Sequence, residues 1–454
     1  MTVAEPSMRD IQSAVSGKEI SAMSVVDTCL ARIKASDAHL NCFTHLATDS
    51  ARAQAREIDQ KVARGDSVGG LAGVPFGVKD LFDVAGEVTH AGARVRLTEP
   101  AAEEDATLVA RLKAADAIYI GRLNMDEFAY GFATVNAHFG TTRNPYDTDR
   151  LAGGSSGGSA ASVAAGLLPL TLGSDTNGSV RVPASLCGLF GLRPTHEALP
   201  MQGVFPFIEQ LDTVGPFTQT LGDMVMAYRA LANRPAPSDR DMSIRVARLG
   251  GWFRSNGDPG GAAGVDAIGA AFGNTPLIEL PLAEAARSAA FLITAKYGGL
   301  LHQETLQHNA MGYDPAVRDR LVAGVALSDS KVDAAKAIIQ AFNRQLQAAL
   351  SEFDILIAPT TPSVAPKISD GWIDVGGRRL SARANLGLFT QPLSVAGVPI
   401  LSVPLKRPGK LPLGIQLISR KHAEERLFNA AARLVKDGLV GFTPPQFELQ
   451  DVTS

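Results

Sequence analysis

The length, composition and charge of the chain are those of a globular enzyme. Its 454 residues are 45% hydrophobic and 20% charged, which supplies enough apolar side chains for a large buried core and excludes disordered and fibrous proteins. The net charge is −3 and lysines and arginines form no run, so we expect no direct binding to nucleic acid or to a membrane surface. The composition and charge are compatible with a small uncharged or anionic substrate.

The lack of a recognisable targeting signal and the pattern of cysteines predict a cytoplasmic protein. The N-terminus lacks a basic stretch followed by an apolar one, and no run of about 18 apolar residues occurs. The three cysteines, Cys29, Cys42 and Cys187, form no Cys-x-x-Cys pair and have no paired histidines, so we expect a reducing compartment and no metal site. Cys187 is predicted to be a small core residue rather than a nucleophile.

The first part of the chain alternates helices and strands. Apolar residues at helical spacing predict a helical N-terminal layer over about residues 1–65. A glycine-rich stretch then leads into a short apolar strand that Lys79 closes. Residues 106–115 are typical of a helix and residues 117–121 of a buried strand. This alternation predicts an α/β fold in which helices cover a sheet.

The second part supplies further elements of the same kind. Residues 159–165 are expected to form a helix between two Ser/Gly loops, residues 354–359 and 399–404 buried strands, and residues 424–435 an amphipathic helix. These strands would complete one sheet, so we predict a single domain over residues 1–454.

One segment interrupts this pattern. Residues 235–264 are polar and rich in proline and glycine, which predicts a lid or an insertion after a core that covers about residues 70–200.

Two Ser/Gly segments, residues 153–159 and 173–184, are the most unusual in composition. A serine hydroxyl is a weak nucleophile and needs a neighbour to accept its proton. A neutral lysine can do so through a second hydroxyl, but the ordinary lysine pKa is about 10.4 and burial must lower it. Val78 and Leu81 are apolar neighbours of Lys79 that would supply this burial.

The second segment contains a loop that is expected to bind a developing oxyanion. We expect the backbone N–H groups of Thr176, Asn177, Gly178 and Ser179 to point at the oxyanion, because Gly178 permits the backbone angles of an anion-binding nest. Asp175 and Arg181 flank this loop, and we expect them to brace it by ion pairing rather than to contact substrate.

Both Ser/Gly segments and their spacing resemble the amidase signature family. The resemblance extends to segments spread over nearly the whole chain, which are residues 77–80, 124–128, 358–362 and 412–417. It implies a mixed central sheet with helices on both faces, and no cofactor. It also implies that Ser179 is the acyl-accepting nucleophile, that Ser155 is the bridging serine held by a cis peptide bond, and that Lys79 is the terminal base. Many family members have glycine or alanine in place of Asn177, so the Asn177 side chain is a candidate substrate contact.

Parts of the sequence also fit three other interpretations. Residues 153–157 also fit the G-x-S-x-G nucleophile elbow, which would make Ser155 the nucleophile of an esterase, but no histidine, His196 and His302 included, lies in a suitable context. A phosphate-binding loop would need a Gly-Lys-[Ser/Thr] ending, which is missing. An inactive scaffold of the same fold would be indicated by loss of Lys79, Ser155 or Ser179, and all three are present.

Within the family, two kinds of substrate compete. Residues 173–179 and 249–254 resemble hydrolases of small ureido compounds such as carboxybiuret, whereas residues 124–131 also resemble the glutamine-hydrolysing subunit of glutamyl-tRNA amidotransferase. That subunit holds the ammonium of glutamine with an acidic residue before its Phe-Thr-x-Pro segment, and the matching residues 383–392 contain no acid. We therefore expect an amidohydrolase of ureido compounds that releases ammonia, with glutamine hydrolysis as the alternative.

Substrate contacts and partners are also predicted. Arg320 and Arg383 are expected to pair with a substrate carboxylate through their planar guanidinium groups. Ala129 and Tyr130 are expected to line the acyl pocket, with ordinary core packing as the alternative. Relatives of both kinds often work with a small helical accessory subunit, so the resemblance implies such a partner and leaves a homo-oligomer open.

Overall fold

The structure is a computed structural model that describes residues 6–233 and 244–446. Its centre is one mixed sheet of eleven strands. The spatial order of these strands is β1 (Phe43–Leu46), β3 (Ile118–Leu123), β2 (Pro75–Lys79), β8 (Leu170–Ser174), β10 (Val214–Thr218), β9 (Phe190–Arg193), β16 (Ile400–Pro404), β17 (Gly414–Ile418), β13 (Ile355–Pro359), β11 (Val246–Leu249) and β12 (Leu277–Ile278). The strands expected at residues 117–121, 354–359 and 399–404 are confirmed.

Strand direction changes along the sheet. β2 runs parallel to β3 and β8, and β11 runs parallel to β12 and β13, while the pairs between these groups are antiparallel. The prediction of an α/β fold with a mixed sheet is confirmed. The sheet joins strands from both ends of the chain, while the single domain over residues 1–454 stays a prediction.

The N-terminal helical layer is confirmed for the described residues 6–65. It consists of α1 (Met8–Ser16), α2 (Ala22–Leu40) and α3 (Thr48–Arg64). Ser7 and Asp10 cap α1 reciprocally, which satisfies N–H groups that the first helical turn leaves free. One detail of the prediction was wrong, because β1 lies between α2 and α3 and adds an antiparallel strand to the edge of the sheet. Residues 1–5 lie outside the described residues.

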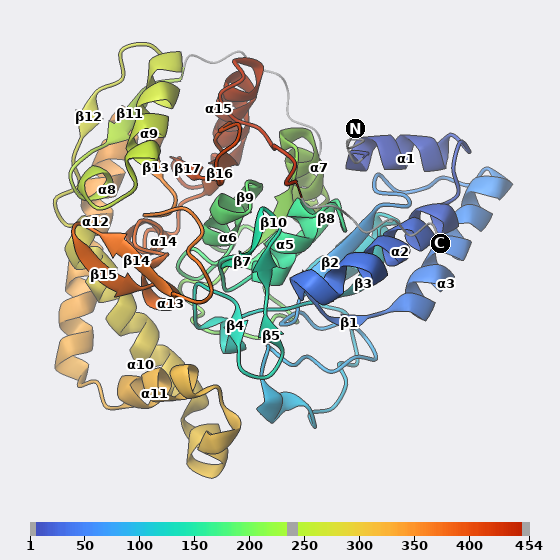
Figure 1. Cartoon of the computed structure of the whole chain (residues 1–454), viewed down its shortest axis with the longest axis horizontal. Coiled ribbons are helices and arrows are strands. Elements are labelled where there is room, and N and C mark those ends of the chain that lie inside the picture. The colour runs from blue at the N-terminus through green and yellow to red at the C-terminus, as the bar shows by residue number, and fades with distance from the viewer. Residues whose placement is uncertain (1–5, 234–243, 447–454) are drawn as a thin grey trace.

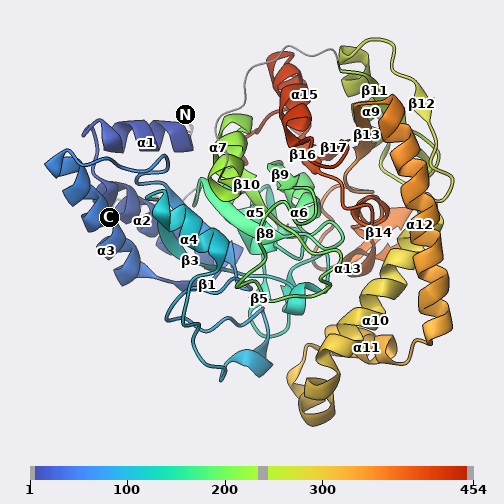
Figure 2. The ribbon, with the colours of Figure 1, turned by 180° about the vertical axis from the view of Figure 1, so that it is seen from behind.

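Helices cover both faces of the sheet (Figures 1 and 2). On the face toward the viewer in Figure 1 lie α5 (Gly157–Ala164) and α6 (Arg181–Leu186), whose residues are all buried. On the face seen in Figure 2 lies α4 (Thr107–Ala114), which packs beside α7 (Leu221–Ala232). Farther along the sheet, α9 (Pro259–Ala271) and α15 (Glu424–Lys436) pack on β13 and β17. The helices predicted at residues 106–115, 159–165 and 424–435 are confirmed.

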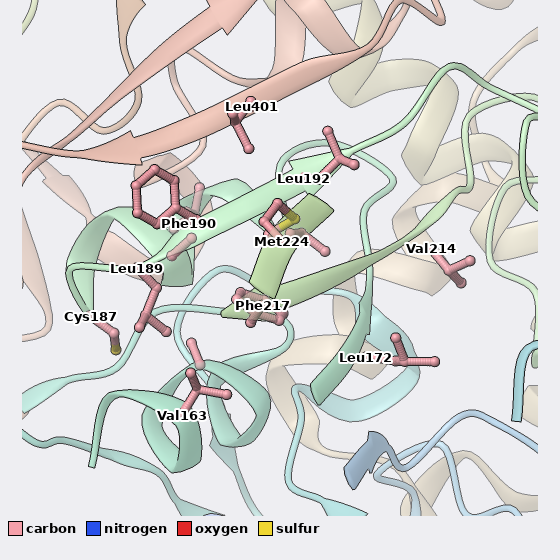
Figure 3. Close-up of a cluster of buried hydrophobic side chains, with 14 of the residues drawn as sticks. Val163, Leu172, Cys187, Leu189, Phe190, Leu192, Val214, Phe217, Met224 and Leu401 are labelled. Atoms are coloured by element: carbon pink, nitrogen blue, oxygen red, sulfur yellow. The ribbon is translucent and has the colours of Figure 1, made fainter. Parts of the chain in front are cut away.

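The core is built where these helices meet the central strands (Figure 3). Leu172 of β8, Leu192 of β9 and Phe217 of β10 are fully buried. Val163 of α5 and Met224 of α7 approach the same strands and are also fully buried. Cys187 is fully buried, so the prediction that it is a core residue is confirmed.

Three further helices, α10 (Ala283–Asn309), α11 (Pro315–Val325) and α12 (Asp329–Glu352), pack on one another at the end of the molecule opposite α1 (Figure 1). The remaining short elements are η1 (Arg94–Arg96), η2 (Glu127–Ala129), β4 (Val135–Asn136), β5 (Gly140–Thr141), β6 (Arg143–Asn144), β7 (Asp147–Leu151), α8 (Trp252–Ser255), η3 (Ala310–Gly312), β14 (Trp372–Val375), β15 (Arg378–Ser381), α13 (Ala382–Asn385) and α14 (Gln391–Ser394). In the described part of the chain, no helix combines the length and the apolar character needed to cross a membrane.

Residues 235–264 were predicted to form a lid or an insertion; their described part adds to the central sheet and forms no separate lid, while the insertion stays a prediction. Residues 246–249 form β11, a strand inside the central sheet, and α9 begins at Pro259 and packs on it. Val246, Ala247 and Leu249 are buried, and this short apolar run is what pairs with β13. Residues 235–243 lie outside the described residues.

Candidate active site

Lys79 lies at the carboxyl end of β2, beside β8. Because β2 and β8 are parallel and Val78 pairs with Leu172, Lys79 lies beside the carboxyl end of β8. Its Nζ donates hydrogen bonds to Ser155 Oγ at 2.7 Å and to Ser174 Oγ at 2.8 Å. The side chain is fully buried, as Val78 and Leu81 predict. Lys79 and Ser155 are therefore joined directly.

Burial changes the charge of this lysine. Loss of hydration lowers the pKa of Lys79 to about 7, and the carboxylates of Asp126, Asp175 and Asp212 oppose this shift only in part. A lysine with such a pKa exchanges a proton readily near neutral pH, which is what a base needs. The neutral lysine that the sequence analysis required is thus accessible.

Ser155 is positioned by the backbone around it. The Gly154–Ser155 peptide bond is cis, as the resemblance implies. The Ser155 carbonyl accepts a hydrogen bond from the N–H of Asp126 at 3.2 Å. A side chain at position 154 would bring its Cβ within 2.2 Å of Asp126 Oδ2, so only glycine allows this close approach.

The loop that carries Ser179 curls around one carboxylate. Asp175 Oδ1 accepts from the N–H of Gly178 at 2.7 Å, and Asp175 Oδ2 accepts from the N–H of Val180 at 3.2 Å. Gly178 has φ +127°, and a Cβ there would lie 2.0 Å from Thr390 Oγ1. The N–H of Ser156 donates to the Ser179 carbonyl at 3.3 Å, which brings the two serine loops together. Ser179 itself is 3% exposed.

Asp175 is held between two buried arginines. Arg181 contacts it through Nε and Nη2, each at 3.0 Å, and Arg193 Nη1 lies 3.0 Å from Oδ1. Burial by itself would raise the pKa of Asp175, but Arg181, Arg193 and the hydrogen bonds outweigh it and hold that pKa well below its ordinary value. The prediction that Asp175 and Arg181 brace the loop is confirmed; Arg193 was not foreseen.

The four N–H groups expected to face an oxyanion differ in whether they already have a hydrogen-bond acceptor within the protein. Gly178 was predicted as a donor, but its N–H is already bonded to Asp175, which removes it from that set. Among the described residues 6–233 and 244–446, the N–H groups of Thr176, Asn177 and Ser179 have no hydrogen-bond acceptor. These three donors stay available to a ligand.

Tyr130 and Arg320 lie against each other. The guanidinium of Arg320 stacks 3.7 Å from the centre of the Tyr130 ring, and its Nη1 donates to the Tyr130 carbonyl at 3.1 Å. The Tyr130 ring also packs on the Phe207 ring, and the two ring centres are 4.9 Å apart. Tyr130 and Ala129 are buried, so their position agrees with either a pocket wall or core packing.

Arg383 is engaged with acidic side chains. Its Nη2 donates to Asp314 Oδ2 at 3.0 Å, and its Nε lies 3.9 Å from Asp126 Oδ1. Asp126 Oδ2 accepts from the N–H groups of Ala133 and Thr134 at 3.1 and 2.9 Å. Part of the guanidinium charge of Arg383 is thus already compensated by the protein, whereas Arg320 has no such ion pair among the described residues.

Several site residues escaped the sequence analysis. Ser174 is the second partner of Lys79, and it lies inside the Ser/Gly segment of residues 173–184, where no role was predicted for it. Asp126 lies in the family-like segment 124–128 and was not assigned a role. Thr294 contacts Asn177 from α10, 117 positions later in the chain, and no local pattern marks it.

Comparison with known proteins decides the family. The family model described as Amidase matches residues 24–248 and 285–428. The chain belongs to the amidase signature family. It is an amide-hydrolysing enzyme, and the expectation from the two Ser/Gly segments is confirmed.

Relatives of this amidase match it over nearly their whole length. AtzE of Pseudomonas sp. (strain ADP), a 1-carboxybiuret hydrolase subunit, is 43% identical over 94% of this chain and 98% of its own. A glutamyl-tRNA(Gln) amidotransferase subunit of Chloroflexus aurantiacus is 35% identical over 92% of this chain and 93% of its own. A solved structure of an inhibitor-bound vestigial protein complex, described as revealing the evolutionary origins of an s-triazine catabolic enzyme, is 41% identical, with a TM-score of 0.91 over 96% of this chain and 100% of that one.

Proposed function

We propose that this amidase hydrolyses a C–N bond of a small ureido compound, biuret-like or carboxybiuret-like, through an acyl-enzyme on Ser179. The observation that carries the mechanism is the 2.7 Å hydrogen bond from buried Lys79 Nζ to Ser155 Oγ. Ser179 Oγ attacks the carbonyl carbon while its proton moves to Ser155 and the proton of Ser155 moves to neutral Lys79. The same route returns a proton to the leaving nitrogen, ammonia departs, and water then hydrolyses the acyl-enzyme.

The negative charge of the tetrahedral intermediate needs donors. We assign this role to the N–H groups of Thr176, Asn177 and Ser179, which have no acceptor among the described residues. Asp175 stabilises the loop that presents them. The buried carboxylate thus acts on the loop and not on the substrate.

The ureido substrate class is supported by the 43% identity to a 1-carboxybiuret hydrolase subunit. Arg320 is the better candidate for a substrate carboxylate, because Arg383 is paired with Asp314. Tyr130 and Ala129 would form the adjoining wall of the acyl pocket. Glutamine hydrolysis is the second candidate, favoured by the 35% identity to the amidotransferase subunit, but the segment of residues 383–392 supplies no acid for the glutamine ammonium.

A small helical partner subunit is part of the proposal. The relative AtzE is named as one subunit of its enzyme, and the similar solved structure is described as a protein complex. A homo-oligomer is compatible with such a partner.

The substrate class is tested by ammonia release from biuret, carboxybiuret, malonamide, glutamine and an aryl amide. We expect the chain, by itself or together with a candidate small partner, to release ammonia fastest from a ureido compound. Turnover of glutamine alone would support the amidotransferase alternative. Release from none of the five, with and without the partner, would contradict the proposed substrate class.

The pH dependence of the reaction tests the role of Lys79. Because its pKa is lowered to about 7, the protonated form is inactive below that pH and the neutral base is present above it. With an uncharged substrate, kcat/KM should rise about tenfold per pH unit up to about pH 7 and then level off. The control is Lys113→Met, which removes a lysine that pairs with Asp105 outside the site and should leave the profile unchanged. A flat profile between about pH 5 and 9 would contradict the role.

A further inference from the structure

The amide of Asn177 has a fixed orientation. Its Nδ2 donates to Thr294 Oγ1 of α10 at 2.8 Å, and the Thr294 hydroxyl in turn donates to the Ala290 carbonyl at 2.7 Å. A hydroxyl has one hydrogen, so Thr294 Oγ1 acts only as an acceptor toward Asn177. A carbonyl oxygen at the position of Nδ2 would therefore face another acceptor. The nitrogen of Asn177 must point at α10, and its Oδ1 points elsewhere.

Asn177 Oδ1 is a buried acceptor without a donor among the described residues. The residue is 6% exposed. An unsatisfied buried carbonyl is unfavourable, so such an atom in a native loop needs an explanation. Asn177 lies two positions before Ser179, and its own N–H is one of the free donors of the same loop. The Oδ1 acceptor therefore belongs to the loop that would surround the reacting carbonyl.

Four other buried polar atoms have no hydrogen-bond partner among the described residues, namely Tyr130 Oη, Arg320 Nε, Asp126 Oδ1 and Arg383 Nε. Arg320 stacks on Tyr130 and approaches Phe291, which lies one turn before Thr294 on α10. Asp126 binds the Ser155 carbonyl through its N–H and approaches Arg383. Tyr130 and Arg320 thus lie against each other, as do Asp126 and Arg383, whereas Asn177 Oδ1 has no hydrogen-bond donor among the described residues. A polar substrate group can supply that donor.

We propose that Asn177 Oδ1 accepts a hydrogen bond from the N–H that flanks the reacting carbonyl on its acyl side, and so selects carbamoyl over alkanoyl groups. This inference rests on the proposed function. In a ureido compound the carbonyl carbon carries two nitrogens: one leaves as ammonia, and the other stays in the acyl-enzyme on Ser179. In an ordinary amide the second position is a carbon, which donates nothing and leaves Oδ1 unpaired. Sites built to bind a substrate N–H reject analogues that lack it.

Thr294 is a positioning residue in this scheme. It does not contact the substrate, and its hydroxyl keeps the Asn177 amide from turning. Without that hydroxyl the Asn177 side chain can rotate, and its NH₂ group can face the substrate N–H in place of Oδ1. The selectivity should therefore depend on the threonine hydroxyl as well as on the asparagine.

The experiment compares biuret with malonamide, in which a CH₂ replaces the central N–H while both terminal amides stay the same. We expect Asn177→Ala to lower the ratio of kcat/KM for biuret to that for malonamide by about 10- to 100-fold. Thr294→Val should lower it by about 3- to 10-fold, and Thr294→Ser, which keeps the hydroxyl, should preserve it. Circular dichroism and thermal melting check that each variant is folded, and Thr294→Val carries the test if Asn177→Ala is not.

The outcomes separate this inference from the proposed function. A wild-type chain that hydrolyses malonamide but no ureido compound contradicts the proposed function and this inference with it. A wild-type chain that hydrolyses biuret, with a ratio that neither variant changes, contradicts the role of Asn177 alone. Equal losses on both substrates would also overturn it, because they would show that Asn177 acts on the amide that the two substrates share.

Discussion

Ser179→Ala is expected to lower kcat by about 10⁴- to 10⁶-fold on every substrate that the enzyme hydrolyses. The variant keeps the N–H of residue 179 and the Asp175 contacts of the loop, so binding and oxyanion stabilisation remain while the acyl-enzyme cannot form. Ammonia release under saturating substrate measures the loss. The size of the effect follows from losing the covalent route altogether, since a nucleophile and its base act as one unit.

The matched control is Ser162→Ala, which removes another buried serine hydroxyl on α5. Among the described residues, that hydroxyl bonds only within the helix, to the Ser159 carbonyl. The variant should retain nearly full kcat. Mass spectrometry of the enzyme quenched during turnover should place the acyl adduct on the peptide that contains Ser179. An adduct on Ser155, or a Ser179→Ala variant within tenfold of wild type, would favour the nucleophile-elbow interpretation of residues 153–157.

Asp175→Ala is expected to lower the free energy of unfolding by about 3–5 kcal/mol. The substitution leaves Arg181 and Arg193, both fully buried, without their shared carboxylate. It also removes the acceptor for the N–H groups of Gly178 and Val180. Because the pKa of Asp175 is held well below its ordinary value, the carboxylate stays charged across the accessible pH range. The substitution should therefore lower the free energy of unfolding at every pH in that range. Urea denaturation measures the change.

Asp266→Ala is the comparison for this measurement. Asp266 also pairs with two arginines, Arg248 at 2.7 Å and Arg254 at 2.8 Å, but its side chain is 36% exposed. Ion pairs in contact with water contribute little, so this variant should lose less than about 1 kcal/mol. Equal losses in the two variants would show that burial does not make the Asp175 cluster important for stability.

Much of the fold was predictable from local sequence. Apolar residues at helical spacing marked the N-terminal layer and α15, and short apolar runs marked β2, β3, β13 and β16. β1 and β11 were missed because each is only four residues long, and a short run does not show periodicity. Their strand character comes from hydrogen bonding to β3 and β13, which lie far away in the sequence.

The family resemblance of the sequence predicts the residues of the proposed chemistry, Lys79, Ser155 and Ser179. The position of Asp175 and Arg181 beside the loop predicts that they brace it. They lie in compact motifs in which each neighbour constrains the backbone. Which partner each polar group takes is settled only in the folded chain. Folding pairs Lys79 with Ser174, bonds the N–H of Gly178 to Asp175, pairs Arg383 with Asp314, and fixes the amide of Asn177 against Thr294. Such pairings depend on which strands and helices become neighbours in space, because hydrogen-bonding groups act only within about 3 Å.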